Sequence, residues 1–224
     1  MTVNAAPPPL SKLATEWLAY ARSVFASGSH LNQCNAPSLT SIDPILRWPG
    51  FVGPEYETAP KRLLLVGRVH NPSGWTVANG LSDLESLAKQ WLGGSMSDPD
   101  FYREYGREYA LRLTTWGPWQ KALVHLAAAA GVDERGVSYV NVAKCWQYPG
   151  KETAMQRRCS KTFPLESLVE IVKPHGVFVL ATDKWMAKVP GAQVTSVPSM
   201  NDSAPHFQIP LERLAKAKAW VRNL

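Results

Sequence analysis

The sequence predicts a single α/β domain with three layers, α/β/α, around a central parallel sheet of about four strands. Short apolar runs alternate along the chain with longer segments of helical periodicity, which is typical of strand–helix–strand units. The runs RLLLVG and GVFVLA are aliphatic throughout, as in parallel strands covered by helices on both faces. Because 224 residues suffice for one substantial core, we expect one domain over residues 1–224.

The N-terminal quarter of the chain contributes one helix and a long loop. Residues 1–10 are proline-rich and are expected to be disordered. Residues 10–25 place Leu13 and Trp17 on one helical face. Residues 26–60 are expected to be mostly loop around an edge of the fold, because Pro, Gly, Asn and Ser interrupt every short apolar run.

The first predicted strand, residues 62–67, precedes a run of helices. Residues 82–92 begin with S-D-L-E, a capping-box pattern, and keep helical spacing up to a pair of glycines. A second helix begins at Asp98, which we expect to be its N-cap. A third begins near Gly117-Pro118 and ends at Gly131.

Strands and helices alternate again in the second half of the chain. A helix over residues 164–172 ends at Lys173-Pro174, since proline disfavours a helical residue before it. The remaining predicted elements are strands at 138–143, 176–181 and 192–197 and a final amphipathic helix at 210–221.

Charge and cysteine content narrow the functional classes. A formal charge of +6 favours a polyanionic partner such as nucleic acid, although many basic proteins bind none. No run reaches the ~18 apolar residues of a membrane span, and MTVNAAPPPL does not resemble a signal peptide. The three cysteines lack a disulfide-framework spacing. We therefore expect a soluble cytoplasmic protein, associated with the nucleoid in a bacterium, with free thiols and no membrane contact.

Polar side chains follow two of the predicted strands. Asn71 comes shortly after the strand at 62–67, and Asn141 lies within the strand at 138–143. Ligands of parallel sheets bind beyond the carboxyl ends of the strands, so both asparagines are candidate site residues. The structural alternative for Asn141 is a turn former at the strand end, and for Asn71-Pro72 a plain turn. The histidines show no spacing of a metal site.

The stretch from Trp116 to Ala181 resembles the uracil-DNA glycosylase superfamily, particularly its iron–sulfur branches. The shared order is a glycine-rich approach, a helix, a strand ending in an N-x-x-K-C-like motif, a further cysteine, a helix, K-P and an apolar strand. Residues 62–214 can be laid onto this plan. The resemblance implies a monofunctional glycosylase that flips uracil out of single- or double-stranded DNA and hydrolyses its glycosidic bond, leaving an abasic site. Separately, we expect the protein to be a monomer.

The same resemblance assigns two central roles. Asn71, in HNPSG, would position the attacking water, with His70 as a possible substitute, although two extra residues separate Gly67 from Asn71 relative to the family form. Asn141 would read uracil, its NH2 donating to O4 and its carbonyl accepting from N3–H. Cytosine reverses both polarities and would be refused.

Supporting roles follow from neighbouring motifs. Trp116 would stack on the flipped base, although core packing explains any one tryptophan equally well. Where the family has an H-P-S-like loop, this chain has Val197-Pro198-Ser199, so the usual histidine is missing. Backbone N–H groups there would stabilise the leaving base instead, and Met200 would wedge into the emptied stack. The full set comprises Arg68 and Val69 in the uracil pocket; Ser199, Met200, Asn201 and His206 in the leaving-group loop; and Lys144, Lys151, Arg157, Arg158 and Lys161 on DNA phosphates. The alternative for the five basic residues is a solvated surface loop that binds no phosphate.

No cofactor or metal is expected. The iron–sulfur branches hold their cluster with four cysteines, whereas this chain offers Cys34, Cys145 and Cys159. Two other functions stay open. One is a DNA-binding protein of the same fold with weak or no catalysis, suggested by the missing histidine. The other is an enzyme acting on a small nucleotide-like ligand, because fold alone does not fix function.

Overall fold

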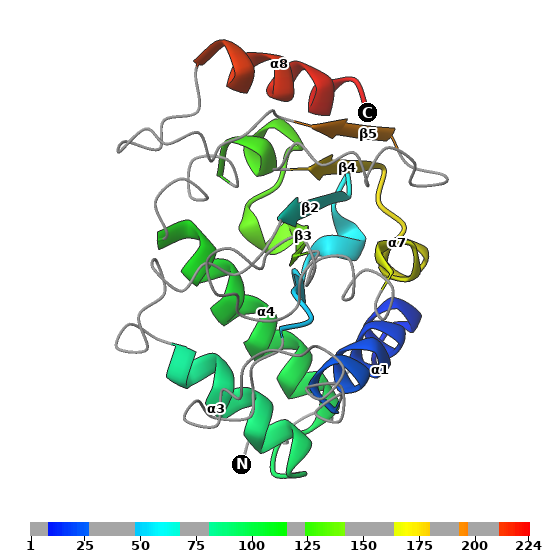
Figure 1. Cartoon of the computed structure of the whole chain (residues 1–224), viewed down its shortest axis with the longest axis vertical. Coiled ribbons are helices and arrows are strands. Elements are labelled where there is room, and N and C mark those ends of the chain that lie inside the picture. Colours follow the sequence, from blue (N-terminus) through cyan, green and yellow to red (C-terminus); the bar gives the residue numbers. More distant parts are fainter. Residues whose placement is uncertain are drawn as a thin grey trace, which may run out of the picture.

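The computed structural model describes residues 9–26, 48–67, 81–115, 124–141, 164–179, 193–196 and 211–224. A five-stranded mixed sheet lies at its centre, in the order β1-β3-β2-β4-β5 (Figure 1). The strands are β1 (Phe51–Val52), β2 (Leu63–Gly67), β3 (Val137–Asn141), β4 (Gly176–Val179) and β5 (Gln193–Ser196). The broad α/β class and the four parallel strands are therefore as predicted.

The fifth strand, β1, corrects the sequence prediction. It lies within the segment expected to be loop, and it pairs antiparallel with β3, which makes the sheet mixed. Two residues are too few to show the alternation that reveals a strand in sequence. The hydroxyl of Ser138 donates to the carbonyl of Phe51 at 2.9 Å and adds a side-chain bond to this edge.

The four parallel strands run in register. Leu63 pairs with Val137 at one end of the β2–β3 ladder, and Gly67 pairs with Asn141 at the other. On the other side of β2, Val66 pairs with Val179, which in turn pairs with Ser196 of β5. The carboxyl ends of all four strands consequently meet at one edge of the sheet.

Each predicted helix is represented within the described residues, while the predicted helix start near Gly117-Pro118 lies outside them. The helices are α1 (Lys12–Ala26), α3 (Leu81–Leu92), α4 (Asp98–Thr115), α7 (Leu165–Val172) and α8 (Leu211–Arg222), with a further helical stretch at 124–129 and short 3-10 turns at Tyr56–Thr58 and Glu134–Gly136. The positive φ of +77° at Gly131 follows the stretch at 124–129, as predicted. Lys173 ends α7 in the left-handed conformation, and its N–H bonds to the carbonyl of Val169 at 2.8 Å.

Two predicted helix starts need correction. Helix α3 already begins at Leu81. Ser82, the first residue of the S-D-L-E pattern, therefore lies inside the helix and is not its N-cap. In α4 the N-cap is Ser97 and not Asp98, because the Ser97 hydroxyl accepts from the N–H of Asp100 at 3.3 Å. The carboxylate of Asp98 instead accepts from the indole N–H of Trp91 at 2.7 Å and from Arg22 at 2.6 Å. These two bonds tie α1 and α3 to the start of α4.

An aromatic row crosses the core from α3 to the sheet. Side chains four apart on one helix share a face, and α4 uses this spacing for Phe101, Tyr105 and Tyr109. Successive ring centroids lie 4.0 Å (Trp91–Phe101), 4.8 Å (Phe101–Tyr105), 5.7 Å (Tyr105–Tyr109) and 6.1 Å (Tyr109–Tyr139) apart. The row, defined as Trp91, Phe101, Tyr105, Tyr109 and Tyr139, thus connects α3 and α4 to β3.

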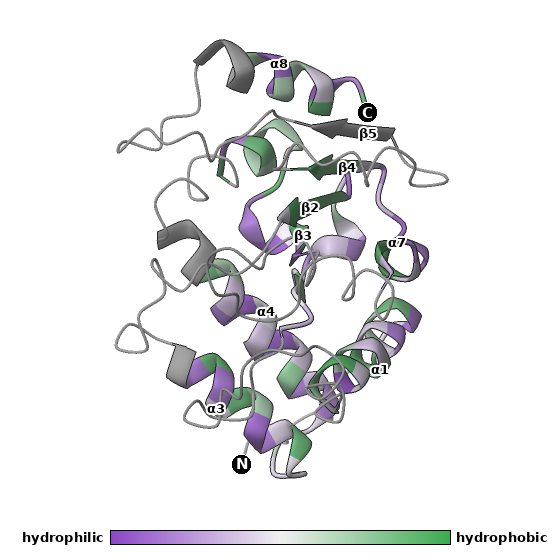
Figure 2. Cartoon of the chain, viewed as in Figure 1, coloured by the Kyte–Doolittle hydropathy of each residue, from purple (hydrophilic) through white to green (hydrophobic). Residues whose placement is uncertain are grey.

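Helix α8 lies at the β5 end of the sheet, beside β5 and β4 (Figure 1). Its Trp220 lies 6.1 Å from Phe178 of β4, ring to ring. Figure 2 shows hydrophobic colouring along β2 and β4 and mixed colouring on α1 and α4. The strands are therefore the apolar centre and the helices its amphipathic cover. Within the described residues, no helix is long and apolar enough to cross a membrane.

Candidate functional site

The candidate site is the carboxyl edge of the four parallel strands. Gly67, Asn141, Val179 and Ser196 are the last residues of β2, β3, β4 and β5, and ladder pairing keeps them adjacent. Backbone N–H groups and side chains at such an edge converge on the space beyond it, which is where parallel sheets bind ligands. Asn141 has the largest polar side chain of the four.

Asn141 belongs to the strand and is fully enclosed. Its side chain is 1% exposed, and it forms the final pair of the β2–β3 ladder with Gly67. A simple turn former at a strand end would be expected to project into solvent. The burial therefore favours a specific role for the carboxamide, either structural or in binding, because a buried amide must be satisfied by designed contacts.

One such contact is with Tyr139. The Tyr139 hydroxyl donates to Oδ1 of Asn141 at an oxygen–oxygen distance of 2.6 Å. Residues two apart in a strand point to the same face, so both side chains share the face that α4 covers. Burial raises the pKa of Tyr139, so its hydroxyl stays protonated at physiological pH.

The surroundings of Tyr139 hold its ring in place. Its ring centroid lies 6.1 Å from Tyr109 and 6.4 Å from Phe51, and those two rings stack on each other at 5.1 Å. The aromatic row therefore ends at a hydrogen bond to the candidate site residue. Sequence reasoning did not select Tyr139, although the Y-x-N spacing within a predicted strand already places the two side chains on one face.

Gly67 shapes the other side of Asn141. Paired residues of parallel strands point to the same face, and a glycine contributes no side chain there. Next to the carboxamide the β2 strand thus presents only backbone.

Asn141 is the one predicted site residue that the described ranges include. All other predicted site residues lie outside them, so the structure does not test whether they gather around Asn141. They are Arg68, Val69, His70, Asn71, Trp116, Lys144, Lys151, Arg157, Arg158, Lys161, Ser199, Met200, Asn201 and His206, together with Cys34, Cys145 and Cys159.

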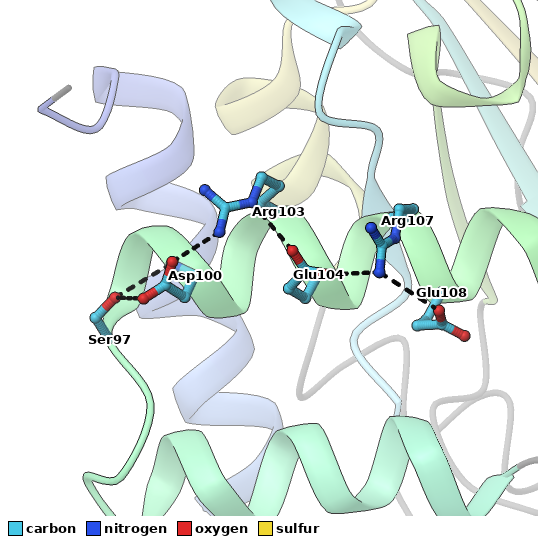
Figure 3. A network of polar contacts seen from close by, with 6 residues as sticks. All are labelled: Ser97, Asp100, Arg103, Glu104, Arg107 and Glu108. Atoms are coloured by element: carbon cyan, nitrogen blue, oxygen red, sulfur yellow. Dashed lines mark hydrogen bonds and ion pairs between the residues drawn. The ribbon is translucent and has the colours of Figure 1, made fainter. Parts of the chain in front are cut away.

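The outer surface of α4 carries charges that neutralise one another. Figure 3 shows Arg103 between Asp100 and Glu104, and Arg107 between Glu104 and Glu108. The shortest N–O distances are 2.8 Å for Arg103–Asp100 and 2.6 Å for Arg107–Glu104. We call Asp100, Arg103, Glu104, Arg107 and Glu108 the charge ladder. Because each arginine already has carboxylate partners, this surface is poorly suited to bind DNA phosphates.

The described part of the chain contains no group of three or more His, Cys, Asp or Glu side chains that would hold a metal ion. In comparisons with known proteins, no family model matches this sequence, and no curated protein matches it significantly. The site is therefore characterised by its own geometry: a buried carboxamide at the carboxyl edge, fixed by a tyrosine and flanked by a glycine.

Proposed function

We propose that this protein is a monofunctional uracil-DNA glycosylase with a three-layer α/β/α fold. The observation that carries the proposal is the buried carboxamide of Asn141 at the carboxyl end of β3, beside Gly67 and hydrogen-bonded to Tyr139. The wider sequence resemblance of residues 62–214 supports the same function.

A fixed carboxamide suits uracil because both polarities of the base edge match. Uracil presents an acceptor at O4 and a donor at N3, which one amide can satisfy through Nδ2 and Oδ1. A carbonyl oxygen has two acceptor sites, so Oδ1 can accept from N3–H while it keeps the bond from Tyr139. In duplex DNA the base must first leave the stack to reach such a group.

Covalent geometry supports a role for Asn71 at the same edge. Asn71 is the fourth residue after Gly67, and four residues of chain span at most about 14 Å. In the proposed reaction, water oriented by Asn71, or by His70, adds to C1′ of the sugar as the bond from C1′ to N1 of uracil breaks. The electron pair of that bond leaves with the base, where N–H donors near O2 stabilise the negative charge. The added water loses one proton to solvent, and the departing uracil anion takes up one proton from solvent after release.

The proposal requires that the amide of Asn141 become accessible to the flipped base. Because the side chain is 1% exposed, binding must change its surroundings. Side-chain amide signals of Asn141 in an ¹⁵N NMR spectrum should therefore shift when an oligonucleotide with a non-cleavable 2′-fluoro-deoxyuridine is added. Unchanged signals under saturating oligonucleotide would place this residue outside the binding site.

The direct test is excision. The protein is incubated with an oligonucleotide that contains one uracil, and alkali then cleaves any abasic site. Strand scission at the uracil position, and none with cytosine at that position, is the expected result. A panel with thymine, hypoxanthine and xanthine defines the base range. Absence of scission at enzyme excess would refute the proposal.

A second function is favoured by one feature of the sequence. Val197-Pro198-Ser199 lacks the histidine that faces O2 of the base in most branches of the resembled superfamily. Salt-sensitive binding of uracil-containing DNA without scission would identify a DNA-binding protein with little or no turnover. Indifference to all DNA would instead indicate an enzyme for a small nucleotide-like ligand.

A further inference from the structure

We infer that Tyr139 is a positioning residue that determines which pyrimidine Asn141 recognises. It does so by holding the carboxamide in the orientation that matches uracil and opposes cytosine. This inference rests on the proposed function, and it assigns the choice of base to a residue behind the base-reading side chain.

The argument begins with the symmetry of an amide. Oδ1 and Nδ2 of asparagine are almost equal in size, and rotation by 180° exchanges an acceptor for a donor at nearly the same positions. Cytosine presents a donor at N4 and an acceptor at N3, so the rotated amide matches cytosine as well as the first orientation matches uracil. An asparagine that reads uracil in DNA therefore needs a second group to fix its rotation.

The Tyr139 hydroxyl is placed to supply that constraint. It donates to Oδ1 over 2.6 Å, and both side chains are almost fully buried. Rotation of the amide would direct N–H groups of Nδ2 at this hydroxyl, whose own proton would then have to turn to another acceptor. Because both groups are buried, exchanging this hydrogen bond for another is costly.

The Tyr139 ring cannot easily follow such a rotation. Phe51 and Tyr109 lie against it, and the aromatic row continues through Tyr105 to α3. Because burial also raises the pKa of Tyr139, the hydroxyl remains a donor across the pH range in which the protein would work. The donor is therefore fixed both in position and in protonation state.

The test compares base discrimination in two tyrosine variants. Tyr139→Phe keeps the ring and removes the donor to Asn141. Tyr105→Phe is the matched control, because its hydroxyl is equally buried in the aromatic row and forms no hydrogen bond with any described residue. Affinities are measured for two oligonucleotides that differ only in 2′-fluoro-deoxyuridine or 2′-fluoro-deoxycytidine, with thermal unfolding of each variant as the folding control.

The expected result is a loss of selectivity in one variant only. The uracil-to-cytosine affinity ratio should fall about five- to tenfold in Tyr139→Phe, the factor expected for one hydrogen bond, and should change less than about twofold in Tyr105→Phe. A folded Tyr139→Phe protein that keeps the wild-type ratio would overturn the inference, as would a wild-type protein that does not discriminate.

The same measurement separates this inference from the proposed function. Because the 2′-fluoro oligonucleotides report binding without cleavage, they test base choice even in a protein that does not excise. A wild-type protein that discriminates but leaves natural uracil uncut would refute the glycosylase proposal, and a loss of that discrimination in Tyr139→Phe would still support the role of Tyr139. If wild type cuts uracil and Tyr139→Phe cuts it with unchanged selectivity, the glycosylase proposal stands and the inference fails.

Discussion

The two ends of the parallel sheet are built in different ways. At the amino end, the backbone N–H of Arg62 donates to Nδ1 of His175 at 3.1 Å, and the N–H of His175 returns a bond to the Arg62 carbonyl at 2.8 Å. The guanidinium of Arg62 also donates to the carbonyl of Lys173, and Lys61 donates to the carbonyls of Val221 and Arg222 at the end of α8. At the carboxyl end, the Tyr139 hydroxyl donates to the side chain of Asn141 at 2.6 Å.

The contacts at the amino end stabilise the fold, whereas the carboxyl end has the geometry of a ligand-binding site. At the amino end, backbone and side-chain groups are paired with one another, and they fasten β2, β4 and α8 together. Such contacts explain how the sheet is held and offer little for a ligand. At the carboxyl end, a pre-oriented carboxamide is placed where parallel sheets bind ligands. Substitutions at the two ends should therefore change different measurements.

The largest effect is expected for Asn141→Ala. Removing the base-reading amide should lower uracil excision at least about 100-fold, since a site built to hydrogen-bond its substrate loses most of its selectivity without that group. DNA binding, which depends mainly on phosphate contacts, should weaken far less. Single-turnover excision and filter binding on the same oligonucleotide measure the two effects.

Ser138→Ala is the matched control for this variant. Ser138 is also buried on β3 and forms a hydrogen bond, but its side chain lies on the opposite face. The Ser138→Ala substitution should lower the unfolding free energy by about 1 kcal/mol and leave excision unchanged. Equal losses of excision and DNA binding in Asn141→Ala would show that Asn141 supports the fold and does not read the base.

At the amino end, Gly176→Ala should change stability and not excision. An added Cβ would lie 2.5 Å from Cδ1 of Leu224 and 2.7 Å from the ring of Trp220, so these two side chains must move away from β4. Overpacking of this kind costs about 1–3 kcal/mol, measurable by urea unfolding. Adding Leu224→Ala should restore part of the loss, because the two changes act on the same contact. A strong fall in excision by the folded Gly176→Ala protein would contradict the division between the ends.

Most of this framework could be predicted from the sequence. The long helices have strong periodicity, and the parallel strands are short runs rich in aliphatic residues; each lies within a few residues of its predicted range. Strand β1 was missed because two residues carry no period, and Ser97 was missed as the cap of α4 because Asp98 is an equally good capping type. Asn141 was identified as a candidate from its place at a strand end. Tyr139 was not, because its role depends on a contact with Asn141 that only coordinates reveal.

His175 should make the amino end sensitive to mild acid. Partial desolvation of the imidazole, and then the positive charge of Arg62, lower the pKa of His175 below the ordinary 6.5. The unfolded chain therefore binds a proton first as pH falls through about 6.5, so the free energy of unfolding should decrease between pH 7.5 and 5. The effect should be smaller than that of Gly176→Ala, because His175 is solvent-exposed.

Urea unfolding of His175→Gln across the same pH range provides the comparison. Glutamine does not titrate, so its curve should be flatter than that of wild type. Asp98 and Asp133 do not confuse the result, because hydrogen bonds hold their pKa values below the ordinary 3.8 and they titrate at lower pH. A wild-type protein as stable at pH 5 as at 7.5 would show that the Arg62–His175 bonds contribute little.

The smallest effect is expected on the charge ladder, which contributes to neither end of the sheet. Arg107→Ala removes the 2.6 Å contact with Glu104, but the Arg107 side chain is 55% exposed, so water and salt screen the pair. The unfolding free energy should fall by less than about 1 kcal/mol in low salt and by less still in high salt. Excision should not change.

Because the opposite face of α4 carries Tyr105 and Tyr109 toward Tyr139, this variant also tests whether a change on the helix surface reaches the site. An excision loss that rivals that of Asn141→Ala would mean that α4 transmits strain through the aromatic row, and base recognition would then depend on the whole helix and not on the carboxyl edge alone.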